Sequence, residues 1–256
     1  MANFELKGKK AIIFGIADEQ SIAWHIAKAL NKDGVRIAVA YQKRVENSIR
    51  PLIELLDDPV SMPCDVVDDS LLDRFFEEAK REFGNVDFLV HSIAFAKKDH
   101  LQGKYFEVDR RGYQISQEVS AYSLTELTKR TYPIMNEEGS IITISYIGSV
   151  RVIPHYNVMG VCKAALEASV RYLSWDVGDK KIRINAISSG PIRTQAASGI
   201  TGLEKLLDHQ IEVAPLHRLN TADDVANLAL FLCSDLSRNI TGQVIYVDAG
   251  YSNMGL

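Results

Sequence analysis

Short apolar runs alternate with longer amphipathic segments along the whole chain, and this alternation restricts the possible folds more than any other feature. The runs are rich in β-branched residues and hardly alternate with polar ones. Such strands are typical of a parallel sheet that helices cover on both faces. The seven candidates are KAIIFGI (10–16), VRIAVAY (35–41), VSMPCDV (60–66), VDFLVHS (86–92), SIITISY (140–146), IRINAIS (182–188) and QVIYVDA (243–249).

Segments between these runs have the periodicity of amphipathic helices, most clearly at residues 21–34, 69–84 and 156–178. Each of the three ranges ends on a glycine, and two of these glycines suit a left-handed C-cap. The repeated strand–helix–strand order indicates the α/β class. We predict a Rossmann-type, doubly wound, seven-stranded parallel sheet with helices on both faces. In such a sheet, ligands bind at the carboxyl ends of the strands.

Length and composition predict a single domain over residues 1–256, because no linker, repeat or low-complexity tract divides the chain. The formal net charge of −4 and the lack of a long basic block argue against a nucleic-acid-binding protein. The apolar runs are much shorter than the roughly 20 residues that cross a bilayer, and MANFELKGKK lacks a signal-peptide core. We therefore expect no membrane association and a cytoplasmic location. Cys64, Cys162 and Cys233 stand singly, so we expect neither a metal site nor a disulfide framework.

The turn after the first strand is a candidate phosphate site. Gly15 closes the strand, and Ser21 and Ile22 begin the following helix, whose first N–H groups could bind a pyrophosphate. The glycine-rich G-x-G-x-x-G fingerprint is absent, however, and only Gly15 remains. On the motif alone, nucleotide binding and an ordinary turn in which Ser21 caps the helix stay as alternatives.

Three further strand ends carry residues that could line the same crevice. The second strand ends in AYQKR, where Gln42 could bond ribose hydroxyls in place of the usual Asp or Glu. Lys43 and Arg44 could pair with a 2′-phosphate or lie in solvent. The other two ends contribute Asp65, Val66, Ser92, Ile93 and Ala94.

Residues 156–163 read YNVMGVCK, in which Tyr156 and Lys163 are separated by seven positions. Each helical residue advances by about 100°, so Lys163 returns to within roughly 20° of Tyr156, two turns further along the axis. Both side chains are therefore predicted to point the same way. A shared helix face can arise by chance, but here the pair follows several strand ends that could line one crevice.

Together these residues resemble the short-chain dehydrogenase/reductase superfamily and, within it, the enoyl-acyl-carrier-protein reductases of bacterial type II fatty-acid synthesis. The resemblance extends over the whole chain. It rests on GIADEQSIA, HSIAFA, Tyr146, the spacing from Tyr156 to Lys163, and SGPIRTQAASGI. Carbonyl-reducing members instead have Tyr-x-x-x-Lys and a serine about a dozen residues before the tyrosine. Here the i+4 position is Gly160. Ser145 lies near the expected place of that serine, but the resemblance implies that the neighbouring Tyr146 takes its place in the site.

The resemblance implies NAD(P)H-dependent reduction of the trans-2 double bond of enoyl thioesters, the last reductive step of fatty-acid elongation. Hydride reaches the β-carbon, so negative charge develops on the thioester oxygen. Tyr156 would donate a hydrogen bond to that oxygen, an arrangement worth about 3–4 kcal/mol in comparable sites. Lys163 would bind the nicotinamide ribose, and Tyr146 would support the same pocket.

The resemblance also implies that residues 192–212 close over cofactor and acyl chain. Pro191, Ile192 and Thr194 would contact the nicotinamide half of the cofactor. The apolar walls of the acyl site would be Ala96, Met159, Leu203 and Leu206. NADH is the expected cofactor because Gln42 favours it, and NADPH is the alternative because Lys43 and Arg44 follow.

The implied partner is an acyl carrier protein that carries an enoyl chain, and the implied assembly is a homotetramer. The stretch Thr201–Lys205 has a single basic residue, so docking of the acidic carrier could use Arg193 or Arg218 instead. Two other functions stay open. One is a carbonyl reductase for ketones or 3-oxoacyl thioesters. The other is a dinucleotide-binding regulator without catalysis, which the presence of Tyr156 and Lys163 argues against, because a regulator has no need of a phenol in its pocket.

Overall fold

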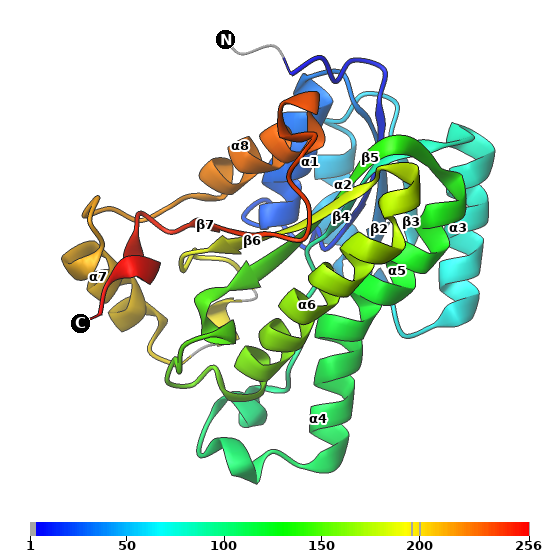
Figure 1. Ribbon diagram of the computed structural model, residues 1–256. Helices are drawn as coiled ribbons and strands as arrows, with labels where there is room; N and C mark the ends of the chain where they lie inside the picture. Colours follow the sequence, from blue (N-terminus) through cyan, green and yellow to red (C-terminus); the bar gives the residue numbers. More distant parts are fainter. Residues whose placement is uncertain (1–3, 196, 200, 256) are drawn as a thin grey trace.

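The computed structural model describes residues 4–195, 197–199 and 201–255. Within these residues, seven parallel strands form one sheet in the order β3-β2-β1-β4-β5-β6-β7 (Figure 1). This confirms the predicted fold class. The strands are β1 (Lys10–Phe14), β2 (Arg36–Tyr41), β3 (Val60–Pro63), β4 (Val86–His91), β5 (Met135–Tyr146), β6 (Arg183–Ser189) and β7 (Val244–Val247).

Helices cover both faces of the sheet, as Figure 1 shows. One face packs against α1 (Ile22–Lys32), α2 (Glu46–Ile53) and α8 (Ala222–Cys233). The other packs against α3 (Asp69–Phe83), α5 (Ser123–Thr131) and α6 (Asn157–Asp176). Consecutive strand residues such as Ile12 and Ile13 point to opposite faces and are both fully buried. This burial on both sides explains why the strands hardly alternate with polar residues.

The strand order reverses at β1, which lies between β2 and β4. The chain builds outward from β1 to β2 and β3, and then crosses back to β4. The connections on the two sides of β1 therefore diverge above the carboxyl ends of the strands. This divergence opens a crevice at the end of the sheet where ligands bind in doubly wound folds.

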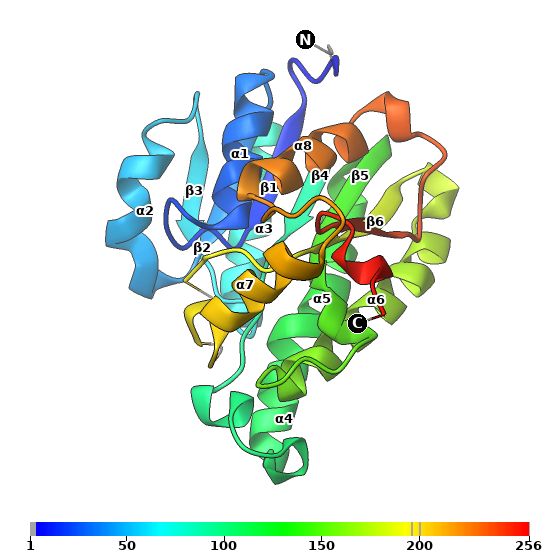
Figure 2. The same cartoon turned by 90° about the vertical axis from the view of Figure 1, so that its left-hand side faces the viewer.

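Two helical elements extend the molecule beyond the sheet. The first is a rod made of α4 (Arg110–Gln117), a π-helical turn at Glu118–Tyr122, and α5, and its α4 end projects past the sheet (Figure 2). The second is α7 (Leu203–Val213), beside which the C-terminal residues lie. There the rings of His209 and Tyr251 pack edge to face, with centroids 5.8 Å apart.

The helix ends agree with the glycine pattern of the sequence. Gly34 follows α1 and Gly84 follows α3, both with positive φ angles, of +84° and +71°. No helix in the described part of the chain is both long enough and apolar enough to cross a membrane. Cys64, Cys162 and Cys233 are buried and free.

Candidate active site

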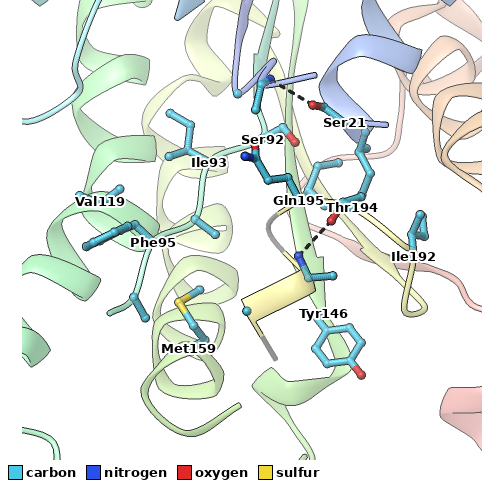
Figure 3. A pocket seen from close by; sticks show the side chains of 18 of the residues that line it. Ser21, Ser92, Ile93, Phe95, Val119, Tyr146, Met159, Ile192, Thr194 and Gln195 are labelled. Carbon is cyan, nitrogen blue, oxygen red and sulfur yellow. Dashed lines mark hydrogen bonds between the residues drawn. The ribbon is translucent and has the colours of Figure 1, made fainter. Parts of the chain in front are cut away.

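A cavity of about 630 Å³ lies at the carboxyl ends of β1, β2, β4, β5 and β6, a volume typical of small-molecule sites. Its wall includes eighteen of the nineteen residues predicted to bind cofactor or substrate. Figure 3 shows Ser21 and Ser92 at one end of this cavity and Phe95, Val119 and Met159 together on one side. The structure thus brings residues from distant parts of the sequence into one site.

The turn after β1 approaches the chain after β4 very closely. Gly15 has a φ of +109°, and a Cβ atom there would lie 2.0 Å from the Ser92 carbonyl oxygen. No other residue type fits this crossing. The single remaining glycine of the predicted motif is therefore the one that the backbone geometry requires.

Ser21 occupies the N-cap position of α1, as the predicted alternative has it, but its side chain bonds the preceding turn and not the helix. Its hydroxyl accepts hydrogen bonds from the backbone N–H groups of Ala17 and Asp18, at 3.0 and 2.9 Å. Its own proton goes to Asp18. The Ser21 side chain makes no capping bond to the first turn of α1, and Ser21 and Ile22 both line the cavity. A helix start of this kind suits a phosphate.

The end of β2 presents Gln42 to the cavity with both ends of its amide engaged. Gln42 donates to the Asp65 carboxylate at 3.3 Å and accepts a bond from Arg44 at 2.8 Å. Asp65 is the one predicted cofactor residue outside the cavity wall, and within the described residues it reaches the site through Gln42. Lys43 forms an ion pair with Glu46. The two cations considered for a 2′-phosphate thus already have protein partners.

Tyr156 and Lys163 reach the same cavity from the start of α6, as the helix geometry predicts. Tyr156 is 8 % exposed, and burial raises the pKa of its phenol above the ordinary value. Lys163 is 5 % exposed and donates from Nζ to the Ile144 carbonyl oxygen at 2.6 Å. Burial lowers the pKa of this ammonium to about 8. At neutral pH the pair is therefore a protonated phenol next to a charged amine.

Backbone packing explains why the lysine follows the tyrosine by seven residues and not by four. The loop after β5 contains a short 3-10 turn, Ile147–Ser149, that packs against α6. A Cβ atom on Gly160 would lie 2.7 Å from the Gly148 carbonyl oxygen, and one on Gly148 would lie 2.5 Å from the Tyr156 ring. A side chain at the i+4 position has no room. The next position on the same side of the helix is Lys163.

Tyr146 closes the site next to Tyr156. The two rings meet edge to face, with centroids 5.0 Å apart and an interplanar angle of 71°. Burial raises the pKa of the Tyr146 phenol above its ordinary value, so this side chain also stays protonated at neutral pH. The predicted supporting position of Tyr146 agrees with this contact.

All four predicted acyl-site residues, Ala96, Met159, Leu203 and Leu206, line the cavity. Ala96, Met159 and Leu206 belong to one apolar cluster. The apolar side chains of the wall that were not predicted include Phe95, Leu101 and Val119. Phe95 belongs to the HSIAFA segment, and its position between the predicted site residues Ala94 and Ala96 could have indicated that it lines the cavity. Val119 lies in the π-helical turn, where the regular helical period is interrupted, so periodicity offers no signal for it.

The predicted covering segment, 192–212, forms a 3-10 turn at Ala197–Gly199 followed by α7, while residues 196 and 200 lie outside the described residues. The predicted contacts Pro191, Ile192 and Thr194 line the cavity. The Thr194 hydroxyl accepts a bond from the Ala197 N–H at 3.1 Å (Figure 3). On the outside, Arg193 pairs with Glu204 of α7 at 2.8 Å.

These residues fit an extended dinucleotide. The bare backbone at Gly15 and the uncapped start of α1 suit the pyrophosphate, and Gln42 suits the adenosine ribose. Lys163 suits the nicotinamide ribose, because the Ile144 carbonyl takes only one of its three N–H donors. The polar groups for the dinucleotide thus extend from Gln42 after β2 to Lys163 in α6. The apolar side chains around Met159 and Leu101 are left for a second ligand.

Comparisons with known proteins agree with this arrangement. The sequence model of the family described as Enoyl-(Acyl carrier protein) reductase matches residues 15–252. An enoyl-acyl-carrier-protein reductase (NADH), FabI, of Synechocystis is 46 % identical over 256 residues, covering 98 % of this chain and 99 % of the relative. The FabI of Bacillus subtilis is 43 % identical and covers 97 % of this chain and 98 % of its own.

Solved structures show the same likeness. The crystal structure of the Bacillus cereus enoyl-acyl carrier protein reductase with NADP+ and indole naphthyridinone superposes with a TM-score of 0.96 at 43 % identity, covering 98 % of this chain and 99 % of that one. The Anaplasma phagocytophilum reductase in complex with NAD superposes with a TM-score of 0.94 at 44 % identity, covering 98 % and 96 %. The overall fold and nearly the full length are therefore shared with these enzymes.

Proposed function

Because the chain belongs to the family of enoyl-acyl-carrier-protein reductases, we propose that Tyr156, Lys163 and Tyr146 carry out its reaction in the cavity described above. The chain is an NADH-dependent enoyl-acyl-carrier-protein reductase, which reduces the trans-2 double bond of enoyl thioesters in the last reductive step of fatty-acid elongation. The observation that carries the residue assignment is the Tyr156–Lys163 pair on one side of α6, with the i+4 position closed by the Gly148 backbone.

Each polar group has a separate task. The reduced nicotinamide supplies the hydride for the β-carbon. Tyr156, kept protonated by burial, donates a hydrogen bond to the thioester oxygen as negative charge develops there. Lys163 holds the nicotinamide ribose with the N–H groups that Ile144 leaves free. Tyr146 packs on the Tyr156 ring and restricts its orientation.

NADH is the proposed cofactor, with NADPH as the alternative. The relatives of Synechocystis and Bacillus subtilis are named as NADH enzymes. In this chain, Lys43 is paired with Glu46, and Arg44 donates a hydrogen bond to Gln42, so both cations near the proposed ribose site already have protein partners. A 2′-phosphate would have to displace at least one of these contacts.

The substrate enters with its acyl chain toward Phe95, Leu101, Val119 and Met159, while the carrier protein docks outside α7. Arg193 is a weak candidate for docking an acidic partner, because Glu204 already neutralises it at 2.8 Å. Lys205 and Arg218 are exposed and take this role in the proposal. We also place the enzyme in the cytoplasm as a homotetramer, for which the exposed Tyr172 and Trp175 on α6 provide an apolar contact face.

The test is a spectrophotometric assay of dihydronicotinamide oxidation with crotonyl thioester and each dinucleotide in turn. We expect oxidation of NADH with the enoyl thioester and none with a 3-oxoacyl thioester or a simple ketone. Turnover of the ketone but not of the enoyl substrate would support the carbonyl-reductase alternative. Binding of NADH without turnover of either substrate would support the regulator.

A further inference from the structure

A buried carboxylate lies directly behind the proposed catalytic residues. Glu167 belongs to α6, one turn after Lys163, and is only 6 % exposed. Its Oε1 atom accepts hydrogen bonds from the Ser145 hydroxyl at 2.5 Å and from the Ser149 hydroxyl at 2.7 Å. Such short distances, about 2.5–2.7 Å, are typical of hydroxyls that donate to an ionised carboxylate. Two hydroxyl donors thus stabilise a negative charge inside the protein.

The bond from Ser145 to Glu167 determines whether Ser145 can donate a hydrogen bond to a substrate. Ser145 lines the cavity in β5, between Ile144 and Tyr146. A hydroxyl has a single proton to donate. Because the Ser145 hydroxyl donates this proton in its hydrogen bond to Glu167, it has none left to donate to a substrate oxygen, although Ser145 lines the cavity.

The second bond fastens a loop. Ser149 ends the 3-10 turn after β5, whose Gly148 packs against the Tyr156 ring and against Gly160. Glu167 extends from α6 and holds this turn from the opposite end. The loop, the tyrosine ring and the helix thereby form one packed unit, and its geometry depends on the carboxylate.

We propose that Glu167 is a positioning residue for enoyl reduction: its carboxylate holds the Ser145 hydroxyl and the turn 147–149 against α6, so that Tyr156 and not Ser145 donates to the substrate oxygen. This inference rests on the proposed roles of Tyr156 and Lys163. Glu167 itself is not among the residues that line the cavity, so it acts through Ser145 and the turn.

The carboxylate also acts on Lys163 through its charge. The titratable groups that influence Lys163 or are influenced by it are Cys162, Glu167 and His91. Burial raises the pKa of the Cys162 thiol to about 11 and lowers the pKa of the buried His91 to about 3, so both are neutral near pH 7. Glu167 is then the neighbour whose charge favours the ammonium and opposes the effect of burial on its pKa.

The experiment compares Glu167→Gln with wild type in kcat, KM for crotonyl thioester and Kd for NADH across neutral and alkaline pH. We expect kcat to fall about tenfold, KM to change less than about twofold, and the alkaline limb of the Kd profile to move to lower pH by about one unit. Asp176→Asn is the matched control, because it removes one carboxylate from the exposed end of the same helix. It should reproduce the wild-type profiles.

A second variant separates the effect of the carboxylate's position from the effect of its charge. It also provides a test if the Glu167→Gln protein fails to fold. Glu167→Asp keeps the negative charge but withdraws the carboxylate by one methylene group. We expect a lower kcat with the alkaline limb unchanged. A wild-type kcat in this variant, or a wild-type pH profile in Glu167→Gln, would overturn the inference. If instead wild type fails to reduce the enoyl thioester, or Tyr156→Phe keeps full kcat, the proposed function has failed and not this inference.

Discussion

Among the described residues, one protein acceptor holds the buried ammonium of Lys163, which lines the cavity. Its Nζ atom donates to Ile144, and burial brings its pKa down to about 8. The group therefore keeps its proton at neutral pH by a small margin. Ribose hydroxyls of a bound dinucleotide would add acceptors and favour the charged form further.

Replacing Lys163 by Met removes the ammonium and keeps much of the side-chain volume. A hydrogen bond from a charged group contributes about 1.5–3 kcal/mol, so we expect the Kd for NADH to rise by at least about tenfold. In wild type, Kd should be constant below about pH 8 and increase above it, because only the protonated amine binds the ribose as a cation. The variant should lack this dependence. NADH titrations followed by fluorescence measure both effects, and an unchanged Kd in the variant would contradict the assignment.

Tyr156→Phe removes the proposed donor and leaves the ring in place. We expect kcat to fall by roughly a hundred- to a thousandfold, because the hydroxyl acts mainly in the transition state. Cofactor affinity should change little. Steady-state kinetics with crotonyl thioester provide the measurement. Tyr132→Phe is the control, since its hydroxyl bonds Asp179 outside the cavity wall, and equal losses in both variants would argue against a specific role for Tyr156.

At the scale of elements, the contact between α6 and the turn 147–149 places Tyr156 and Lys163, the pair proposed to be catalytic. This contact depends on two glycines that face each other, Gly148 and Gly160, and on the bonds of Glu167 to the same loop. The helix and the loop can approach closely only because neither glycine carries a Cβ atom. The family's unusual tyrosine–lysine spacing is thus a packing requirement in this chain.

Gly160→Ala tests this packing. In a free helix the change would favour folding by about 1 kcal/mol, but here the new Cβ atom would lie 2.7 Å from a backbone oxygen. We therefore expect a lower melting temperature together with a lower kcat, because the turn 147–149, which directly follows Tyr146, must move. Gly178→Ala is the control, as nothing lies within 4 Å of its Cβ position. A thermally stabilised, fully active Gly160→Ala enzyme would contradict the packing argument.

At the scale of the whole molecule, large aromatic side chains on α6 remain in solvent. Tyr172 is 78 % exposed and Trp175 is 86 % exposed. Their positions, three residues apart in one helix, place them on neighbouring parts of the outer surface. Exposed aromatic groups of this kind are enriched at interfaces between protein chains.

We expect light scattering to find a particle of four times 28.5 kDa. Changing both Tyr172 and Trp175 to Ser should shift the protein to smaller species, because the apolar contact would be lost. Leu55→Ser is the control, since Leu55 is 72 % exposed on the opposite side of the sheet, near α2. An unchanged tetramer in the double variant would place the interface elsewhere, and a wild-type monomer would contradict the proposed assembly.

The sequence alone determined the class of the fold and the direction of the two side chains that we propose to be catalytic, Tyr156 and Lys163. Strand and helix periodicities are local, so the seven strands and the shared side of Tyr156 and Lys163 could be predicted from backbone geometry over a few residues. The alternation of strands and helices along the chain indicated the doubly wound class. The strand ends and the resemblance to a family together pointed to about half of the residues that line the cavity.

Only the tertiary structure decided which groups are partners. The bonds of Glu167 to Ser145 and Ser149, the link between Gln42 and Asp65, and the close approach of Gly148 to Gly160 join separate elements. The Ser21 hydroxyl bonds the loop and not the helix for the same reason. A hydrogen bond or steric contact between distant segments depends on how whole elements pack, and no local pattern of residues contains that information.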